Sequence, residues 1–151
     1  MNKKLENINI IKQLESFFNK NAQKLNIEIV FLFGSQAGGF PKGDSDIDIG
    51  IVFDSDKFSD EEIFLKSTDI SSDISEIAGS DVNVIPVYND FRKPLLYYNI
   101  IILGKPLYIG NYDKYVSLKN EAIFQMEDFS IFGEKWMFEV AKNKLKDIVN
   151  A

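Results

Sequence analysis

The sequence predicts an α/β (α+β) protein in which a small mixed β-sheet is packed by helices. Short apolar runs rich in β-branched and aromatic residues alternate along the chain with longer amphipathic segments, the pattern of strands and helices that share one core. The 151 residues, 45% of them hydrophobic and 26% charged, have the length and composition of one globular domain. No internal repeat or linker divides them, so we expect a single domain over 1–151 with its core at about 27–109.

The first part of the chain predicts one helix and two strands. Residues 3–25 carry apolar side chains at steps of three and four, which is typical of one buried helix face. Residues 27–33 and 46–53 are short runs of β-forming residues, and the glycine-rich segment 36–44 between them is expected to be a loop. The apolar positions of the helix are Leu5, Ile8, Ile11, Leu14, Phe18, Ala22 and Leu25.

A capping-box pattern predicts the start of a second helix. Ser59 is followed three residues later by Glu62, and Gly79 has the residue type that commonly follows the last helical turn. We therefore expect a helix between these residues. Its buried face should contain Ile63, Ile70, Ile74 and Ile77.

The next segment predicts a strand, a helix and a short edge strand. Residues 81–87 are polar and then apolar, as the second strand is. Pro94 near its start and Gly104 after its end bracket a helix over about 93–103, because proline suits the first helical turn and glycine the position after the last. Residues 106–109 follow as the edge strand.

The last segment, 113–149, is helical by pattern, and we expect a break at Phe132 and Gly133. Its aromatic side chains are too many for one narrow stripe, so most are expected in the core and any exposed remainder would form a partner surface. These aromatic residues are Phe124, Phe129, Phe132, Trp136 and Phe138.

Composition excludes several classes of function. The net charge is −6, the sequence pI is about 4.7 and Arg92 is the single arginine, so broad nucleic-acid binding is not expected. The chain has no Cys and no His, which excludes disulfides, thiolate nucleophiles and imidazole catalysis. The longest apolar stretch, 95–103, is too short to span a bilayer, and the N-terminus has no signal-peptide core. We expect a cytoplasmic protein without a membrane partner.

One segment has the residues for metal-assisted chemistry on phosphates. Gly34 and Ser35 directly follow a predicted strand, where backbone amides and a hydroxyl can hold a phosphate. Asp46 and Asp48 follow ten residues later, and carboxylates two apart on a strand share one face at about 6–7 Å. Such a pair repels unless a cation lies between, and hard oxygen ligands without His or Cys favour Mg²⁺ or Mn²⁺.

The acidic segment has other possible interpretations. Asp44, Asp46 and Asp48 could be only a solvated turn before a strand, and this interpretation stays open on the segment alone. An EF-hand loop does not fit, because its sixth position would be Ile49 and its twelfth Ser55. A P-loop does not fit either, since the only lysine nearby is followed by Gly-Asp rather than Ser or Thr.

The spacing of these residues resembles the signature of the DNA polymerase β-like nucleotidyltransferase superfamily. Gly34-Ser35, ten residues and Asp46-x-Asp48 match it, and the chain is similar to the minimal nucleotidyltransferases encoded beside helical HEPN proteins in prokaryotic toxin–antitoxin pairs. The resemblance extends over about 27–108 and implies the fold of that superfamily, with a helical C-terminal extension. Its later matching parts are Val82 to Ile85, Pro94 to Leu95 and Gly104 to Tyr108.

The resemblance implies a role for each matching residue. Gly34 and Ser35 would hold the β- and γ-phosphates of ATP, and Asp46 and Asp48 would ligate two Mg²⁺ ions. The family has a third carboxylate on the next strand, which helps to deprotonate the acceptor hydroxyl. That position falls here on Asn83, whose amide can ligate Mg²⁺ but cannot accept a proton.

Further departures and weaker candidates remain. Asp81 lies two residues before Asn83, on the same face by strand parity, and is the candidate substitute for the third carboxylate. Gly38 stands where relatives often carry Arg. Lys42 and Arg92 could touch a triphosphate, although an exposed loop lysine is more commonly solvated and Arg92 also precedes a predicted helix.

The leading interpretation is an antitoxin that transfers AMP from ATP to a hydroxyl of a cognate HEPN toxin, a tyrosine by family resemblance. One rival is transfer to a small hydroxylated molecule, for which the tail of about forty residues looks thin. The other is a protein of the same fold that neutralises a partner by contact and catalyses little, an interpretation that Asn83 favours.

Overall fold

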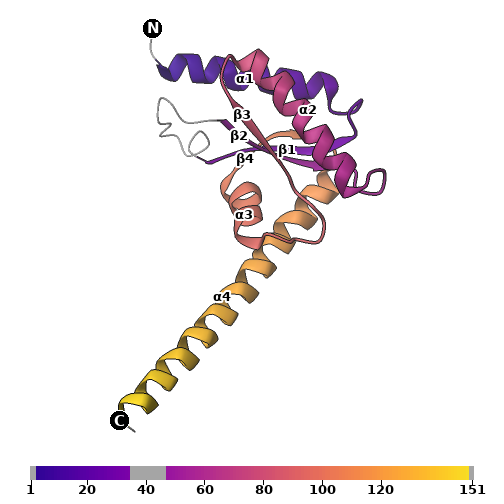
Figure 1. Cartoon of the computed structure of the whole chain (residues 1–151). Coiled ribbons are helices and arrows are strands. Elements are labelled where there is room, and N and C mark those ends of the chain that lie inside the picture. Colours follow the sequence, from indigo (N-terminus) through magenta and orange to yellow (C-terminus); the bar gives the residue numbers. More distant parts are fainter. Residues whose placement is uncertain (1–2, 35–46, 150–151) are drawn as a thin grey trace.

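Four strands form one mixed sheet with helices on both faces (Figure 1). The structure is a computed structural model, and it describes residues 3–34 and 47–149. The elements in chain order are α1 (Lys3–Asn21), β1 (Ile27–Phe33), β2 (Ile47–Phe53), α2 (Asp60–Ala78), β3 (Val82–Pro86), α3 (Pro94–Tyr98), a π-helical turn (Asn99–Leu103), β4 (Lys105–Ile109) and α4 (Tyr112–Val149). The predicted α/β fold class and its predicted strands are confirmed, within a residue or so at their ends.

The strand order across the sheet is β3-β2-β1-β4. β1 pairs antiparallel with both β2 and β4, whereas β2 and β3 are parallel. β3 and β4 are therefore the two edges of the sheet. The short edge strand expected at residues 106–109 is confirmed as β4. The start of β2, the start of β3 and the end of β1 meet at one end of the sheet.

Alternate residues of the central strands point into two separate cores. Leu32 and Ile49 pack beneath α1 and α2 on one face, whereas Phe31 and Val52 pack against α3 and the first turns of α4 on the other (Figure 1). β1 and β2 are buried along most of their length because both faces are covered. This burial explains why both strands are continuous apolar runs in the sequence.

The predicted capping box is present at the start of α2. The Ser59 hydroxyl accepts a hydrogen bond from the Glu62 backbone N–H at 3.2 Å, and Gly79 ends the helix with a φ of 67°. The expected apolar face is confirmed for Ile63, Ile70 and Ile74. It is wrong for Ile77, which is 42% exposed in the last turn of α2.

Two predicted helices differ from the observed ones. α1 ends at Asn21 rather than at residue 25, because the carbonyl of Ala22 accepts from Ile27 N–H at 2.8 Å and Asn26, with a φ of 56°, turns the chain into β1. The helix expected over 93–103 changes after α3 into the π-helical turn. A Cβ on Gly50 of β2 would lie 2.5 Å from Ile100 of that turn, so the turn packs directly on strand backbone.

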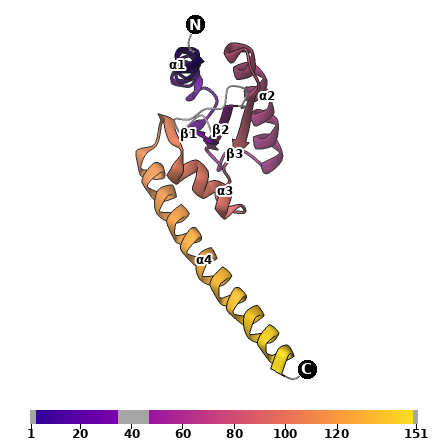
Figure 2. The same ribbon diagram turned by 90° about the vertical axis from the view of Figure 1, so that its left-hand side faces the viewer.

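α4 is one continuous helix, so the break expected at Phe132 and Gly133 is wrong. The whole helix is about 57 Å long at 1.5 Å per residue, and its later part extends away from the sheet in both views (Figures 1 and 2). Only its first turns join the core, through Leu118 and Ala122. None of the described helices has the length and apolar character needed to cross a bilayer.

The expectation that most tail aromatics lie in the core is also wrong for those that the structure describes. Phe124, Trp136 and Phe138 are 63%, 60% and 69% exposed. The side chains of Phe129 and Phe132 lie outside the described part of the chain. The reason is geometric: the later part of α4 extends away from the sheet (Figure 2), and none of its residues after Ala122 whose burial is described is buried.

Candidate active site

Asp48 of β2 and Asn83 of β3 lie opposite each other at one end of the sheet. They are paired in the parallel register of these strands, and the Asn83 side-chain amide Nδ2 donates to Asp48 Oδ1 at 3.3 Å. Asp48 is half-buried and Asn83 is exposed. Asn83, which the resemblance placed at the third-carboxylate position, therefore contacts Asp48, the aspartate of the Asp46-x-Asp48 pair that the structure describes.

Gly34, at the end of β1, lies against the same carboxylate. Its φ is +78°, and a Cβ built on it would lie 2.6 Å from Asp48 Oδ2. Both the backbone conformation and the space therefore require glycine here. Neighbouring Phe33 pairs with Asp48 across the antiparallel β1–β2 ladder, which fixes this close approach.

Two of the predicted site residues, Ser35 and Asp46, lie outside the described residues, as do Gly38 and Lys42. Asp81 is described: it is exposed, directly precedes β3, and its carbonyl oxygen accepts from Ile47 N–H at 3.3 Å. Its backbone thus lies beside the start of β2. Residues 3–34 and 47–149 contain no cluster of three carboxylate ligands, so Asp48 and Asn83 are the described part of the predicted metal site.

The Asp48 carboxylate has no cationic partner among the described side chains. The ion pairs of that part of the chain join Lys57 to Asp54 and Arg92 to Asp60 and Asp90. The one side-chain donor that Asp48 has there is the neutral Asn83 amide. A half-buried carboxylate with so little compensation can bind a cation, and its hard oxygens suit Mg²⁺.

An open groove of about 620 Å³ begins at Asp48 and Asn83 and runs between α2 and β3. One wall of the groove is β3 from Asn83 to Pro86. The other wall is α2, which contributes Phe64 and a series of side chains that carry hydroxyl groups. No motif in the sequence pointed to this wall, although Ser and Thr at steps of three and four, alongside the isoleucine face of α2, could have indicated it. The hydroxyl-bearing residues are Ser67, Thr68, Ser71, Ser72 and Ser75.

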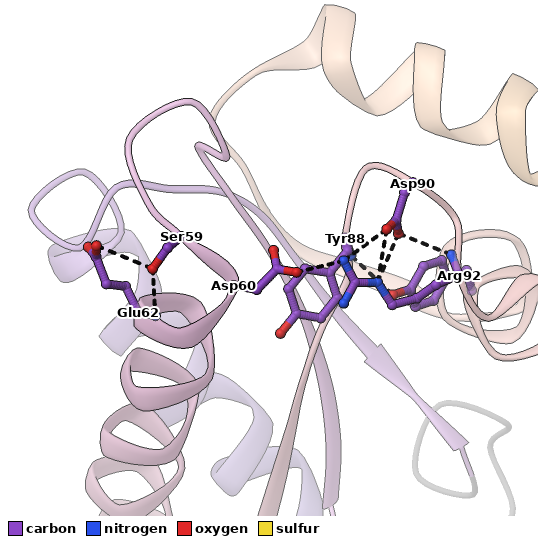
Figure 3. Close-up of polar contacts among 7 residues, drawn as sticks. Ser59, Asp60, Glu62, Tyr88, Asp90 and Arg92 are labelled. Carbon is purple, nitrogen blue, oxygen red and sulfur yellow. Dashed lines mark hydrogen bonds and ion pairs between the residues drawn. The ribbon is translucent and has the colours of Figure 1, made fainter.

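Arg92 lies away from this site. Its guanidinium forms ion pairs with Asp90 at 2.9 Å and with Asp60 at 3.0 Å, and it stacks 3.8 Å from the Tyr88 ring centre (Figure 3). The hydrogen bond from Arg92 lowers the pKa of Asp90. This cluster follows the end of β2, whereas Asp48 is near its start, so Arg92 joins α2 to the segment before α3 and does not take part in the candidate site.

Comparison with known proteins gives a family match over most of the folded core. Residues 12–113 match the family described as polymerase beta, nucleotidyltransferase. This match covers more than half of the chain. No curated protein matches the sequence.

Solved structures of similar fold are toxin–antitoxin complexes. A toxin–antitoxin structure with AMP-PNP has a TM-score of 0.65 at 18% identity, over 83% of this chain and 97% of that one. The MntA–HepT complex has a TM-score of 0.58 at 18% identity, over 91% and 97%. The structure of tri-AMPylated Shewanella oneidensis HEPN toxin in complex with MNT antitoxin has a TM-score of 0.57 at 17% identity, over 92% and 98%. At these identities the likeness establishes the fold.

Proposed function

The chain belongs to the polymerase beta nucleotidyltransferase family, and from this premise we propose that it transfers AMP from ATP to a tyrosine hydroxyl of a HEPN-type toxin. It would act as the antitoxin of that toxin, as one nucleotidyltransferase domain in the cytoplasm. The observation that carries the proposal is the contact of Gly34, Asp48 and Asn83 at one end of the sheet. The similar fold of antitoxins, seen with AMP-PNP and with an AMPylated toxin, supports the choice of nucleotide and partner.

The proposed triphosphate seat consists of Gly34 and Ser35, and Asp46 and Asp48 would hold Mg²⁺. The donor chemistry fits, since the Asp48 carboxylate has no cationic partner among the described residues and the Asn83 amide oxygen is a hard ligand. Rotation of the amide by half a turn would direct this oxygen, instead of Nδ2, toward Asp48. When bound, Mg²⁺ would supply positive charge to the triphosphate at the α-phosphorus.

Asn83 supports a second candidate function. Its amide cannot accept the proton of an acceptor hydroxyl, and it already donates to Asp48. A chain of this kind could neutralise its partner by contact while transferring AMP slowly or not at all. The two functions differ in whether the partner becomes labelled, not in whether it binds.

We assign partner binding to α4 in either case. Its described turns after Ala122 expose Phe124, Trp136 and Phe138, together with further apolar side chains. Large apolar anchors supply much of the affinity of protein interfaces, and the acidic residues Glu121 and Glu127 on the same helix would repel a nucleic-acid backbone. A helical HEPN protein is therefore the occupant that we propose for this surface.

Labelling of the partner tests the proposal directly. The chain, Mg²⁺, α-phosphate-labelled ATP and the purified HEPN-type product of the adjacent reading frame should give a labelled partner in a single turnover. A tyrosine as the labelled residue supports the first function. A stable complex without label supports the second, and a partner that is neither bound nor labelled contradicts both.

A further inference from the structure

We propose that the groove between α2 and β3 holds an extended polypeptide segment that carries the acceptor hydroxyl. The groove is continuous with the candidate site, because Asp48 and Asn83 form one of its ends. This inference rests on the proposed function and names the substrate class that the site would take. Three features support it: the direction of attack, the free edge of β3 and the chemistry of the groove wall.

The direction of attack follows from the strand order. Gly34 directly follows β1, Asp48 is on β2 and Asn83 on β3, and the groove lies beside β3 at the edge of the sheet. In phosphoryl transfer the attacking oxygen, the phosphorus and the leaving oxygen are roughly in line. With the leaving phosphates at Gly34 and the α-phosphorus near Asp48, the acceptor must therefore approach from the β3 side.

The bond changes of this step balance. The hydroxyl oxygen of the acceptor forms a bond to the α-phosphorus, and the bond from that phosphorus to the bridging oxygen breaks. Pyrophosphate leaves with the electron pair of the broken bond, and the hydroxyl proton passes to water. Asn83, at the mouth of the groove, has no lone pair basic enough to receive this proton.

The outer edge of β3 offers one place for a main chain to pair. Asp81 and Val87 bond to β2, so in a parallel ladder the even-numbered residues between them face outward. Val82 is already occupied, since its N–H donates to Ser75 Oγ at 2.9 Å and its carbonyl accepts from Ser71. Pro86 has no N–H, which leaves the N–H and carbonyl of Val84 for a peptide in the groove.

The wall of the groove suits an uncharged polypeptide. Thr68 and Ser72 present hydroxyls from α2, and Phe64, 62% exposed, gives an apolar contact at the end away from Asp48. No Lys or Arg is among the lining residues, and Asp48 is the single charged one. A nucleic acid would bring phosphates to this wall without a cation to pair them, so a peptide is the better occupant.

A reversible block of the groove tests the inference. The chain has no cysteine, so Ser72→Cys creates a unique thiol in the groove wall, and a disulfide-linked thionitrobenzoate on it fills the groove until dithiothreitol removes it. Asp73→Cys, treated in the same way, is the matched control, because Asp73 is the next residue of α2, exposed and outside the groove lining. The probes are a nine-residue peptide with one central tyrosine, which spans the groove, and N-acetyltyrosinamide, which does not.

The expected result is a loss of AMP transfer to the peptide by about tenfold in the blocked Ser72→Cys variant, restored by dithiothreitol. Transfer to N-acetyltyrosinamide and the thermal shift with MgATP should change little, as should both transfers in the Asp73→Cys variant. If AMP transfer to the peptide survives the block, or falls equally in the Asp73→Cys control, the groove is not the acceptor site. The proposed function is not contradicted by that result.

A binding measurement separates the two proposals further. Fluorescence polarisation of the labelled peptide reports its binding to the chain without any turnover. Binding that the Ser72 block abolishes, in a chain that labels neither acceptor, supports the groove and contradicts the proposed transfer. If the block does not change binding of the peptide, the inference that the groove holds it is contradicted, whatever the transfer assay shows.

Discussion

The side chains of Asn83 and Asp48, 35 positions apart in the chain, meet through a 3.3 Å hydrogen bond across two parallel strands. The Asn83 amide lies beside the Asp48 carboxylate. A second carboxylate in that place would repel Asp48 unless a cation lay between them. Asn83 thus stabilises the metal-free site and, in the proposed mechanism, removes a proton acceptor from it. The predictions below begin with this pair.

Asn83→Asp should raise AMP transfer while leaving the fold intact, because the substitution is nearly isosteric. General-base catalysis contributes about 10²–10⁴-fold, which sets the scale of the expected gain. Single-turnover labelling with α-phosphate-labelled ATP measures it. Asp81→Asn is the companion variant: if it abolishes a strong wild-type activity, Asp81 has taken the role. Full wild-type activity that survives Asp81→Asn contradicts both assignments.

Asp48→Asn, alone or with Asp46→Asn, should remove the stabilisation of the folded chain by MgATP. A ligand at one hundred times its Kd stabilises the native state by about 2.7 kcal/mol, or roughly 5–10 °C in Tm for a chain of this size. Thermal unfolding with and without MgATP measures the shift. Asp73→Asn, an exposed carboxylate on α2, should keep the full shift, and calorimetry that finds equal nucleotide affinity in the Asp48→Asn variant refutes the site.

Gly34→Ala should destabilise the chain and disturb the Asp48 carboxylate, because both the φ of +78° and the 2.6 Å approach oppose a Cβ. Gly79→Ala is a matched control: its φ of +67° is similar, but no atom lies within 4 Å of the added Cβ. Both variants should lose about 1–2 kcal/mol from backbone strain. Chemical denaturation should show a larger loss for Gly34→Ala, and that variant alone should lose binding of MgATP.

Trp136→Glu and Phe138→Glu on α4 should weaken partner binding without changing the stability of the domain, since both side chains are exposed. An anchor worth about 2 kcal/mol corresponds to a roughly thirtyfold rise in Kd. Lys142→Glu changes charge at another exposed position of α4 and should have a much smaller effect. Salt-sensitive co-purification of nucleic acid with no protein partner would contradict the assignment of α4.

Acid should weaken the link between α2 and the segment before α3. The pKa of Asp90 is lowered in the folded chain by its hydrogen bond with Arg92, so its contribution is present above its usual pKa of 3.8 and is lost as the pH falls through the lower folded value. Arg92→Gln removes the partner. The Tm difference between wild type and this variant should therefore shrink below a pH of about 3.8, and a difference that is constant with pH contradicts this account.

Much of the fold could be predicted because its signals are local. The capping box of Ser59 and Glu62 and the apolar runs of β1 and β2 each lie within a few residues. The break expected at Gly133 was wrong because glycine costs an exposed helix only about 1 kcal/mol, which the helix formers around it offset. The exposure of the tail aromatics depends on the direction in which α4 leaves the sheet, and no local pattern fixes that direction.

The candidate site was predictable in part for the same reason. The spacing from Gly34 to Asp48 is local, whereas the contact of Asp48 with Asn83 depends on strand pairing. The family resemblance assigned Asn83 to the third-carboxylate position, but it could not show that the amide donates to the carboxylate. The groove beside Ser72 depends on how α2 packs on β3, which is why it became visible only in the folded chain.

The length of α4 has a consequence for how long an unbound chain survives. Beyond Ala122 none of the residues of α4 whose burial is described is buried, so few tertiary contacts support these turns, and isolated helices in water are marginally stable. Such turns open locally far more often than the sheet does, which exposes their amides to hydrogen exchange and their peptide bonds to proteases. A partner that covers α4 slows both processes, so the half-life of the chain increases with the amount of partner present.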